Sequence, residues 1–248
     1  MKVIISPAKK MNVNPDSLPV TGMPRFMEET KILCSTIQGL PYGEAKALWQ
    51  CNDKLASLNF ERFSGMDLEN GLTPAILSYE GLQYQHMSPA VFSDEAIGYV
   101  KAHLRILSGF YGVLNPFDGV VPYRLEMQAR LTVQGKKDLY EYWGDRLYRT
   151  VLDEDCTIIN LASKEYSAAI EKYLTPEDKF ITVEFGELSG GKIKQKGTLA
   201  KMARGAMVRF MAENNVGNAE GLKAFSSLGY QYSEELSGQN KMVFLLVQ

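Results

Sequence analysis

The residues best suited to do chemistry are cations that lie close together without acidic neighbours. Between Lys192 and Arg209 there are six lysines and arginines and no aspartate or glutamate, a local charge of +6 in a chain whose total is -2. A helix over 198–212 would place three of these cations opposite its apolar face, with Gly205 among them, where a backbone can approach closely. The three are Lys201, Arg204 and Arg209. Exposed helices usually pair cations with acids one turn away, so this pattern predicts an anionic partner; a solvated helix face is the alternative.

A second candidate is the junction where a predicted strand over 157–161 meets a predicted helix over 163–173. Free backbone N–H groups and the helix dipole attract anions at such a junction, and strand ends are common ligand sites. Ser163 opens this helix, and Glu165 lies in its first turn. Ser163 is therefore a candidate ligand contact, with a plain helix cap as the alternative.

A third candidate is Ser6-Pro7-Ala8-Lys9, directly after the first predicted strand. This is the serine-x-x-lysine pattern, in which the lysine activates a serine nucleophile. The companion motifs of that mechanism do not occur in the chain. The favoured interpretation is therefore that Lys9 reaches an anion from the end of the strand.

Three acids, Glu126, Asp145 and Glu165, lie among aromatic residues or glycines. A pair of them would serve as general acid and base if the fold brings them together, and salt bridges to nearby arginines are the alternative. The only histidines, His86 and His103, have no carboxylate or thiol at ligand spacing. We therefore expect no metal site and no cofactor.

Length and composition predict one domain over residues 1–248, since 45% hydrophobic content supplies a core without disulfides. No apolar run approaches the ~20 residues of a membrane span, so we expect a cytoplasmic protein. The three cysteines are widely spaced and are expected to be reduced. A net charge of -2 argues against a protein that binds nucleic acid over its whole surface, so any affinity for phosphate must be local.

The elements that must position these residues follow from apolar patterning and caps. Apolar and β-branched runs predict strands over 2–6, 75–79, 157–161, 180–185, 191–195 and 242–247. Periodicity and capping residues predict helices over 24–38, 43–50, 52–60, 94–108, 140–152, 163–173 and 198–212. Strands alternate with helices early and form hairpins late, which predicts an α/β fold with a mixed β-sheet covered by helices.

The stretch Leu104–Gly112 has the apolar-x-Gly-apolar-x-Gly character of a helix-hairpin-helix turn. In such a turn the glycine N–H groups meet a DNA phosphate. Pro116 follows closely and would displace a second helix, so a tight loop is the alternative.

Together these segments resemble the YaaA peroxide-stress family. The resemblance rests on segments spread over nearly the whole chain. They are residues 5–9, 52–56 with Asn59, Arg62 and Phe63, 104–127, 138–140, 143–145, 160–166, 203–205 and Arg209-Phe210.

The resemblance implies a family-specific α/β fold with a positively charged cleft and a helix-hairpin-helix-like element. It also implies binding to DNA, as duplex or distorted duplex, and a role in limiting oxidative damage by peroxide and free iron. Carried onto matching positions, the nucleic-acid-binding candidates are Lys9, Lys54, Arg62, Arg105, Arg124, Lys201, Arg204 and Arg209. The polar or catalytic candidates are Ser6, Tyr111, Glu126, Asp145, Ser163 and Glu165.

The acids of that set leave a second function open. Carboxylates repel a phosphate backbone, so acids beside arginines favour a pocket that handles one base or sugar. The alternative is therefore a glycosidase-like or lyase-like enzyme that acts on a nucleobase or nucleotide. The test is whether the fold brings together Lys9, Arg124, Ser163 and Arg204. Their convergence with Glu126 or Asp145 in a deep pocket favours the enzyme, and a shallow open groove favours simple binding.

Overall fold

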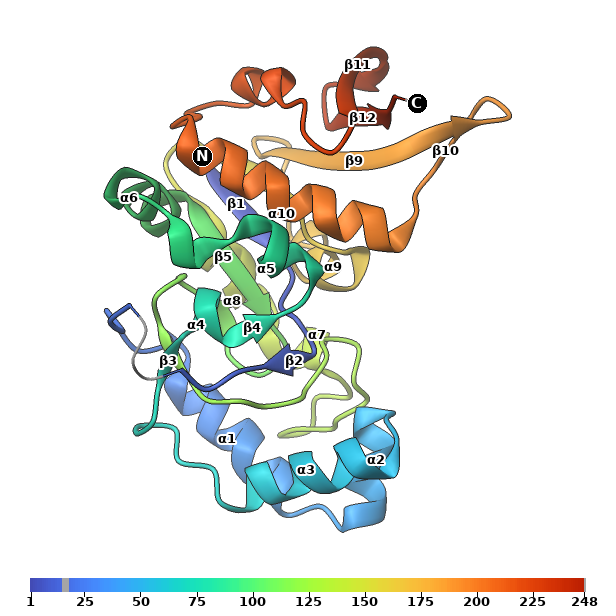
Figure 1. The fold of residues 1–248 in the computed structure, drawn as a ribbon. Helices are drawn as coiled ribbons and strands as arrows, with labels where there is room; N and C mark the ends of the chain where they lie inside the picture. Colours follow the sequence, from blue (N-terminus) through green and yellow to red (C-terminus); the bar gives the residue numbers. More distant parts are fainter. Residues whose placement is uncertain (15–17, 248) are drawn as a thin grey trace.

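The computed structural model describes residues 1–14 and 18–247. In this part of the chain an eight-stranded mixed sheet runs through the molecule, with helices on both of its faces (Figure 1). The strands are β1 (Lys2–Ile5), β5 (Leu104–Ser108), β6 (Gly112–Leu114), β8 (Thr157–Asn160), β9 (Lys179–Ser189), β10 (Lys192–Lys194), β11 (Tyr230–Gly238) and β12 (Lys241–Leu246). The predicted α/β fold with a mixed sheet is confirmed.

Five neighbouring strands, β12, β9, β8, β1 and β5, are parallel. Numbered along the chain they stand in the order 5-4-3-1-2, which read from the other edge is the doubly wound order 2-1-3-4-5. The order reverses between β1 and β8, where Ile4 pairs with Asn160 at the end of β8. Ligands of doubly wound sheets bind beyond the carboxyl ends of the strands at this switch point, so the fold itself marks the ends of β1 and β8.

Antiparallel strands border this parallel centre. The edge strands β6 and β11 pair with β5 and β12, and β10 folds back on β9 in an arm that projects from the sheet (Figure 1). Two short ladders lie outside the main sheet. They pair β2 (Lys10–Met11) with β4 (Tyr79–Glu80), and β3 (Thr73–Pro74) with β7 (Gly119–Val120).

The helices follow the predicted order in most places. They are α1 (Met27–Gln38), α2 (Tyr42–Trp49), α3 (Asp53–Ser64), α4 (Ala75–Ser78), α5 (Leu82–Met87), α6 (Asp94–His103), α7 (Leu139–Trp143), α8 (Arg146–Val151), α9 (Lys164–Glu171) and α10 (Gly197–Glu213). Short 3-10 turns cover Pro89–Val91 and Glu220–Ala224. Side-chain caps start two of the predicted helices, since Asn52 accepts from Leu55 N–H and Ser93 accepts from Ala96 N–H.

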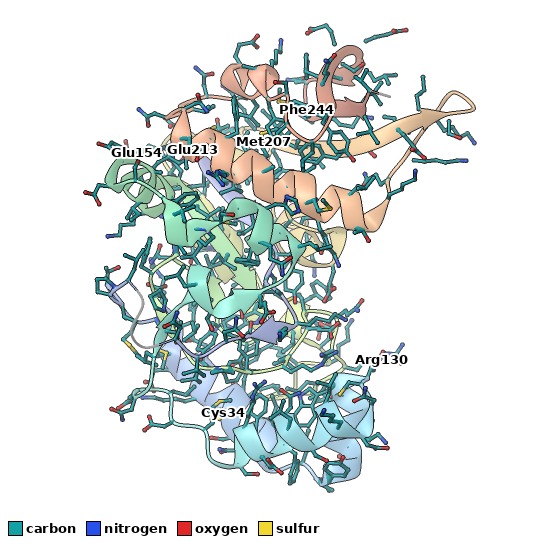
Figure 2. The ribbon with its side chains drawn as sticks, in the orientation of Figure 1. Cys34, Arg130, Glu154, Met207, Glu213 and Phe244 are labelled. Atoms are coloured by element: carbon teal, nitrogen blue, oxygen red, sulfur yellow. The ribbon has the colours of Figure 1, made fainter. Side chains whose placement is uncertain are left out.

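The apolar face of α10 packs into the interior. Met207 of α10 and Phe244 of β12 are both fully buried, and their side chains fill the space between helix and sheet (Figure 2). The helices α1, α2 and α3, from the first quarter of the chain, form a group at the other end of the molecule (Figure 1). Cys34 of α1 is buried in that group (Figure 2), and burial raises the pKa of its thiol.

The helix-hairpin-helix turn predicted at Leu104–Gly112 is wrong. The helix α6 ends at His103, and the next residues form β5 because Leu104 pairs with Val3 of the buried strand β1. A β-hairpin then leads into β6. Gly109 in this turn lies against backbone, since an added Cβ would be 2.6 Å from the carbonyl oxygen of Leu125. The glycine is required for packing.

Two further expectations differ from the structure. Residues 75–79 were predicted to be a strand, but Ala75–Ser78 is a short helix that starts directly after Pro74. The predicted helix over 140–152 is divided into α7 and α8 at Gly144, whose φ of 55° is outside the right-handed helical region.

Candidate functional site

A cavity of about 380 Å³ lies beyond the carboxyl ends of β1 and β8, at the switch point of the sheet. Loop residues after β1, the start of α5, the segment 123–126, the start of α9 and the first turns of α10 surround it. The lining residues are Ser6, Pro7, Ala8, Lys9, Lys10, Glu80, Gly81, Leu82, Gln83, Tyr84, Tyr123, Arg124, Leu125, Glu126, Ser163, Glu165, Tyr166, Lys201 and Arg204. Segments far apart in the sequence therefore line one cavity.

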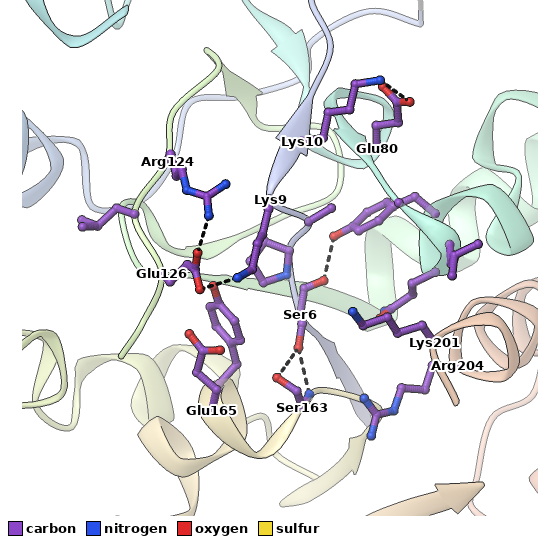
Figure 3. A pocket seen from close by; sticks show the side chains of 18 of the residues that line it. Ser6, Lys9, Lys10, Glu80, Arg124, Glu126, Ser163, Glu165, Lys201 and Arg204 are labelled. Atoms are coloured by element: carbon purple, nitrogen blue, oxygen red, sulfur yellow. Dashed lines mark hydrogen bonds and ion pairs between the residues drawn. The ribbon is translucent and has the colours of Figure 1, made fainter. Parts of the chain in front are cut away.

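Two serines join the strand ends at the floor of the cavity (Figure 3). The backbone N–H of Ser163 donates to Ser6 Oγ at 2.8 Å, and the Ser6 hydroxyl donates to Ser163 Oγ at 3.2 Å. Tyr84 fixes the same loop, because its hydroxyl donates to the Ser6 carbonyl oxygen at 2.9 Å. Ser163 is the N-cap residue of α9, but its side chain caps no N–H of that helix. Its hydroxyl group faces the cavity instead.

Two cations of α10 border the serines on one side (Figure 3). Arg204 is half-buried, and its Nε is a buried donor without a hydrogen-bond partner in the described chain. Burial lowers the pKa of the Arg204 guanidinium. Lys201 lies one turn earlier and is exposed. Among the described residues no carboxylate forms a salt bridge with either cation, so this side of the cavity has an uncompensated positive charge.

The other side of the cavity holds two cations that are already paired. Lys9 Nζ lies 2.8 Å from Glu126 Oε2, and Arg124 Nη2 lies 3.1 Å from Glu126 Oε1. The Arg124 side chain is mostly buried, and its Nε donates to the Trp49 carbonyl oxygen at 3.4 Å. Glu126 is thereby ion-paired with both cations.

Glu165 lies beside this group and differs from Glu126 in its surroundings. It is half-buried, and its Oε1 accepts a hydrogen bond from the Gln128 N–H at 3.3 Å. Burial raises the pKa of Glu165, the Gln128 hydrogen bond opposes the rise, and the negative charge of Glu126 adds to it. Glu165 therefore holds a proton more readily than an exposed glutamate does.

Aromatic side chains form much of the wall, and sequence reasoning missed them. Tyr84, Tyr123 and Tyr166 line the cavity and are almost fully buried. Tyr123 is fixed by hydrogen bonds of its hydroxyl to Ser108 Oγ at 2.6 Å and to the Tyr79 hydroxyl at 2.8 Å. Tyr123 and Tyr166 lie within segments that carry the family resemblance and Tyr84 lies outside them, but the three meet only in the fold. A rigid, largely aromatic wall suits a flat organic ring.

Eight of the fourteen predicted site residues line the cavity. They are Ser6, Lys9, Arg124, Glu126, Ser163, Glu165, Lys201 and Arg204. The predicted convergence of Lys9, Arg124, Ser163 and Arg204 is therefore present, and it includes Glu126.

The other six predicted residues lie outside the cavity, and three of them have evident structural roles. Asp145 forms a 2.6 Å ion pair with Arg149, the alternative that was left open for it. Tyr111 is buried in the core, where its hydroxyl accepts from the Val121 N–H. Arg105 donates to the carbonyl oxygen of Leu104 and is partly buried in β5.

The last three are cations on helices. Arg209 pairs at 2.8 Å with Glu213, the last residue of α10 (Figure 2). Lys54 and Arg62 belong to α3, at a distance from the strand ends, and burial lowers the pKa of Arg62. These residues do not contribute to the charge of the cavity.

Gly205 is a point of close backbone approach, as expected, but the approaching backbone belongs to α5. A Cβ at residue 205 would lie 1.9 Å from the carbonyl oxygen of Gln83. The small residue lets α10 pack directly on α5, and both helices contribute to the cavity. Gly205 therefore influences the shape of the cavity through the packing of α10 on α5, although it does not line the cavity itself.

Residues 1–14 and 18–247 contain no group of three or more histidine, cysteine, aspartate or glutamate side chains that could hold a metal ion. No helix in these ranges is sufficiently long and apolar to cross a membrane.

Comparison with known proteins gives matches along the whole chain. A family model described as "Peroxide stress protein YaaA" matches residues 1–236. A UPF0246 protein of Agathobacter rectalis is 55% identical over 244 residues, which cover 98% of this chain and 98% of the relative. A UPF0246 protein of Lachnoclostridium phytofermentans is 52% identical over 245 residues, covering 99% of this chain and 96% of the relative. A UPF0246 protein of Desulfitobacterium hafniense is 53% identical over 245 residues, covering 99% of this chain and 98% of the relative.

Proposed function

This chain belongs to the YaaA family of peroxide-stress proteins, and from that premise we propose that it binds DNA through the cavity at the ends of β1 and β8. Binding there limits the damage that peroxide and free iron cause to DNA. The positively charged cleft expected from the sequence is, in this proposal, the side of the cavity bordered by α10.

The observation that carries the proposal is the unpaired charge of Arg204 and Lys201. A cation removed from water is costly unless an anion or hydrogen-bond acceptors surround it. Arg204 has a buried Nε without a partner, whereas Lys9 and Arg124 on the opposite side are compensated by Glu126. A phosphate group supplies the missing anion, and arginine binds phosphate well because its fork of donors matches the phosphate oxygens.

The size of the cavity determines which part of DNA enters it. About 380 Å³ is within the range of small-molecule sites and is far too small for a duplex. One unstacked nucleotide fits, as in proteins that take a base out of the helix. Lys192 and Lys194 on the exposed arm, next to α10 in sequence, are then available to the backbone outside the cavity.

The test is the salt dependence of DNA binding, measured by fluorescence anisotropy with labelled single-stranded DNA and with duplexes that carry one unpaired nucleotide. The logarithm of affinity should fall by roughly 0.7–0.9 per phosphate contact for each log unit of salt. Lys201→Ala and Arg204→Met should weaken binding and make the slope shallower. Lys179→Ala is the matched control, since it removes an exposed cation at the amino-terminal end of β9, at the opposite end of the parallel strands from the cavity. A DNA affinity that does not change with salt concentration, or an equal loss of affinity in all three variants, would refute the proposal.

A second function, an enzyme, is favoured by the convergence of Glu126 with the predicted cations in one cavity and by the burial of the neighbouring Glu165. A carboxyl group with a raised pKa beside a second carboxyl group is a usual arrangement for an acid and a base. In hydrolysis of an N-glycosidic bond, the oxygen of water bonds to C1′ and the C1′–N bond breaks. The base leaves with its electron pair and takes a proton from Glu165, while Glu126 accepts the proton that water loses.

This enzymatic function is tested by incubating the protein with oxidised DNA and analysing the released bases. Release should stop in Glu165→Gln and fall in Glu126→Gln. Asp145→Asn is the control, because Asp145 is ion-paired outside the cavity. Absence of any released base from the wild-type protein would exclude this function and leave binding alone.

A further inference from the structure

The cavity has two ends of different chemistry, and the difference constrains the ligand beyond its being a nucleic acid. In Figure 3, Lys201 and Arg204 stand on one side of the Ser6–Ser163 pair, whereas Glu126 and Glu165 stand on the other. In the described part of the chain no acid is ion-paired with Lys201 or Arg204, and the glutamate nearest to them in Figure 3, Glu80, is paired with Lys10, whereas the second end contains two glutamates. A ligand that satisfies both ends must be anionic at one end and must offer hydrogen-bond donors at the other.

The α10 end of the cavity is lined by several hydrogen-bond donors. Ser6 Oγ accepts from the Ser163 N–H and gives its own proton to Ser163 Oγ. The hydroxyl proton of Ser163 is therefore free to turn toward a ligand, since a hydroxyl has one donor and two acceptor positions. Together with the guanidinium of Arg204 and the ammonium of Lys201, it forms a set of donors for a tetrahedral group with several acceptor oxygens.

The acidic end excludes a second phosphoryl group. Glu126 is compensated by Lys9 and Arg124, so those cations are not available to another anion. The carboxyl oxygens of Glu126 and Glu165 accept hydrogen bonds from N–H groups of a ligand. Glutamate contacts the exocyclic amino group of cytosine in this way in protein–DNA complexes. Adenine and guanine also carry amino groups, and thymine carries none.

We propose that the cavity is a nucleotide site, with one phosphoryl group between Ser163, Lys201 and Arg204 and an amino-bearing base against Glu165. The tyrosine wall lies between the two ends and contacts the sugar or the ring. The proposal rests on the function proposed above insofar as the nucleotide is part of a DNA strand. The same chemistry is present in a free nucleoside monophosphate, so the test must separate the two sources.

Isothermal titration calorimetry with the full-length protein provides that test. The probes are the 5′-monophosphates of deoxyguanosine, deoxyadenosine, deoxycytidine and thymidine, and the unphosphorylated nucleosides. The three amino-bearing nucleotides should bind more tightly than thymidine monophosphate. Each nucleotide should bind more tightly than its nucleoside by roughly 10- to 100-fold, the effect of charge-assisted hydrogen bonds.

Variants assign the two ends. Arg204→Met keeps the length of the side chain and should remove most of the advantage that the phosphate confers, without changing nucleoside affinity. Glu165→Gln, whose side-chain amide is both donor and acceptor, should reduce the preference for amino-bearing bases. Lys179→Ala is the control and should behave as the wild type. Circular dichroism verifies that each variant is folded.

The outcomes separate this proposal from DNA binding itself. If no mononucleotide binds while DNA binds in a salt-dependent manner, the nucleotide site is wrong and DNA binding stands. If mononucleotides bind and DNA does not, the ligand is a free nucleotide and the proposed DNA function is wrong. Equal affinity for nucleotides and nucleosides overturns the phosphoryl position, and equal affinity for the thymine nucleotide overturns the base position.

Discussion

The substitution Gly205→Ala tests the packing that places α10 beside the cavity. An added Cβ would lie 1.9 Å from the Gln83 carbonyl oxygen, 2.8 Å from its carbonyl carbon and 3.0 Å from the Met87 nitrogen. All three are backbone atoms, so no side-chain rotation relieves the overlap. The helices α5 and α10 must move apart, and the cavity that both line must change shape.

The magnitude follows from two opposing effects. Replacing glycine by alanine within a helix favours folding by about 1 kcal/mol. Overpacking usually costs about 1–3 kcal/mol, and more where rigid backbone is in the way. We expect a net loss of about 2 kcal/mol or more in the free energy of unfolding, which lowers Tm by about 4–8 °C for a chain of this size.

The matched control is Gly98→Ala in α6. Gly98 is exposed within a helix, and an added Cβ would meet nothing within 4 Å. Its Tm should rise by about 2–4 °C from helix propensity alone. Thermal unfolding followed by circular dichroism measures both variants. A Gly205→Ala protein as stable as Gly98→Ala would refute the packing argument.

Two further predictions concern buried polar groups. Burial raises the pKa of Glu165 in the folded state, the negative charge of Glu126 adds to the rise, and Lys9 opposes it. The protonated form therefore stabilises the fold at pH values below the ordinary pKa of 4.5. This contribution is lost as the pH rises through the folded pKa. The Tm of Glu165→Gln should therefore exceed that of the wild type at pH 7, and the two Tm values should converge below about pH 4. A difference in Tm that stays constant across this range would contradict the pKa shift. Ser108→Ala removes a fully buried hydroxyl that accepts hydrogen bonds from the N–H groups of Phe110 and Tyr111. Urea unfolding should therefore show a loss of about 1–3 kcal/mol in the free energy of unfolding. An unchanged free energy would show that water or another group satisfies these donors.

The parallel centre of the sheet could be predicted because its strands are continuous apolar runs. Residues 2–6 and 157–161 have this pattern, and both strands are present. Leu104–Ser108 could not be separated from the preceding helix, since its leucines continue the helical period of α6 while pairing with β1 decides the structure. The edge strand β11 has polar and half-exposed residues and lacks a clear pattern, so its pairing with β12 is visible only in the fold.

Only part of the candidate site could be predicted, because tertiary contacts decide which of its cations are ion-paired. No acid lies near Arg204 in the sequence, and among the described residues none forms an ion pair with it, but Arg209 pairs with Glu213, one turn beyond the acid-free stretch. Lys196 pairs with Glu187 across the hairpin, a contact that spacing within a helix does not indicate. Ser163 is at the predicted N-cap position, yet its partner is Ser6, 157 residues away. Local spacing identified the cations, and tertiary structure decided which of them are free.

The most direct test of the central claim is a crystal structure of the protein bound to a short single-stranded DNA. The account predicts a phosphoryl oxygen within about 2.7–3.2 Å of the Arg204 guanidinium and of a cavity serine, with one base against Glu165. A complex in which the DNA contacts another face of the molecule, and Arg204 Nε still has no acceptor, would contradict it.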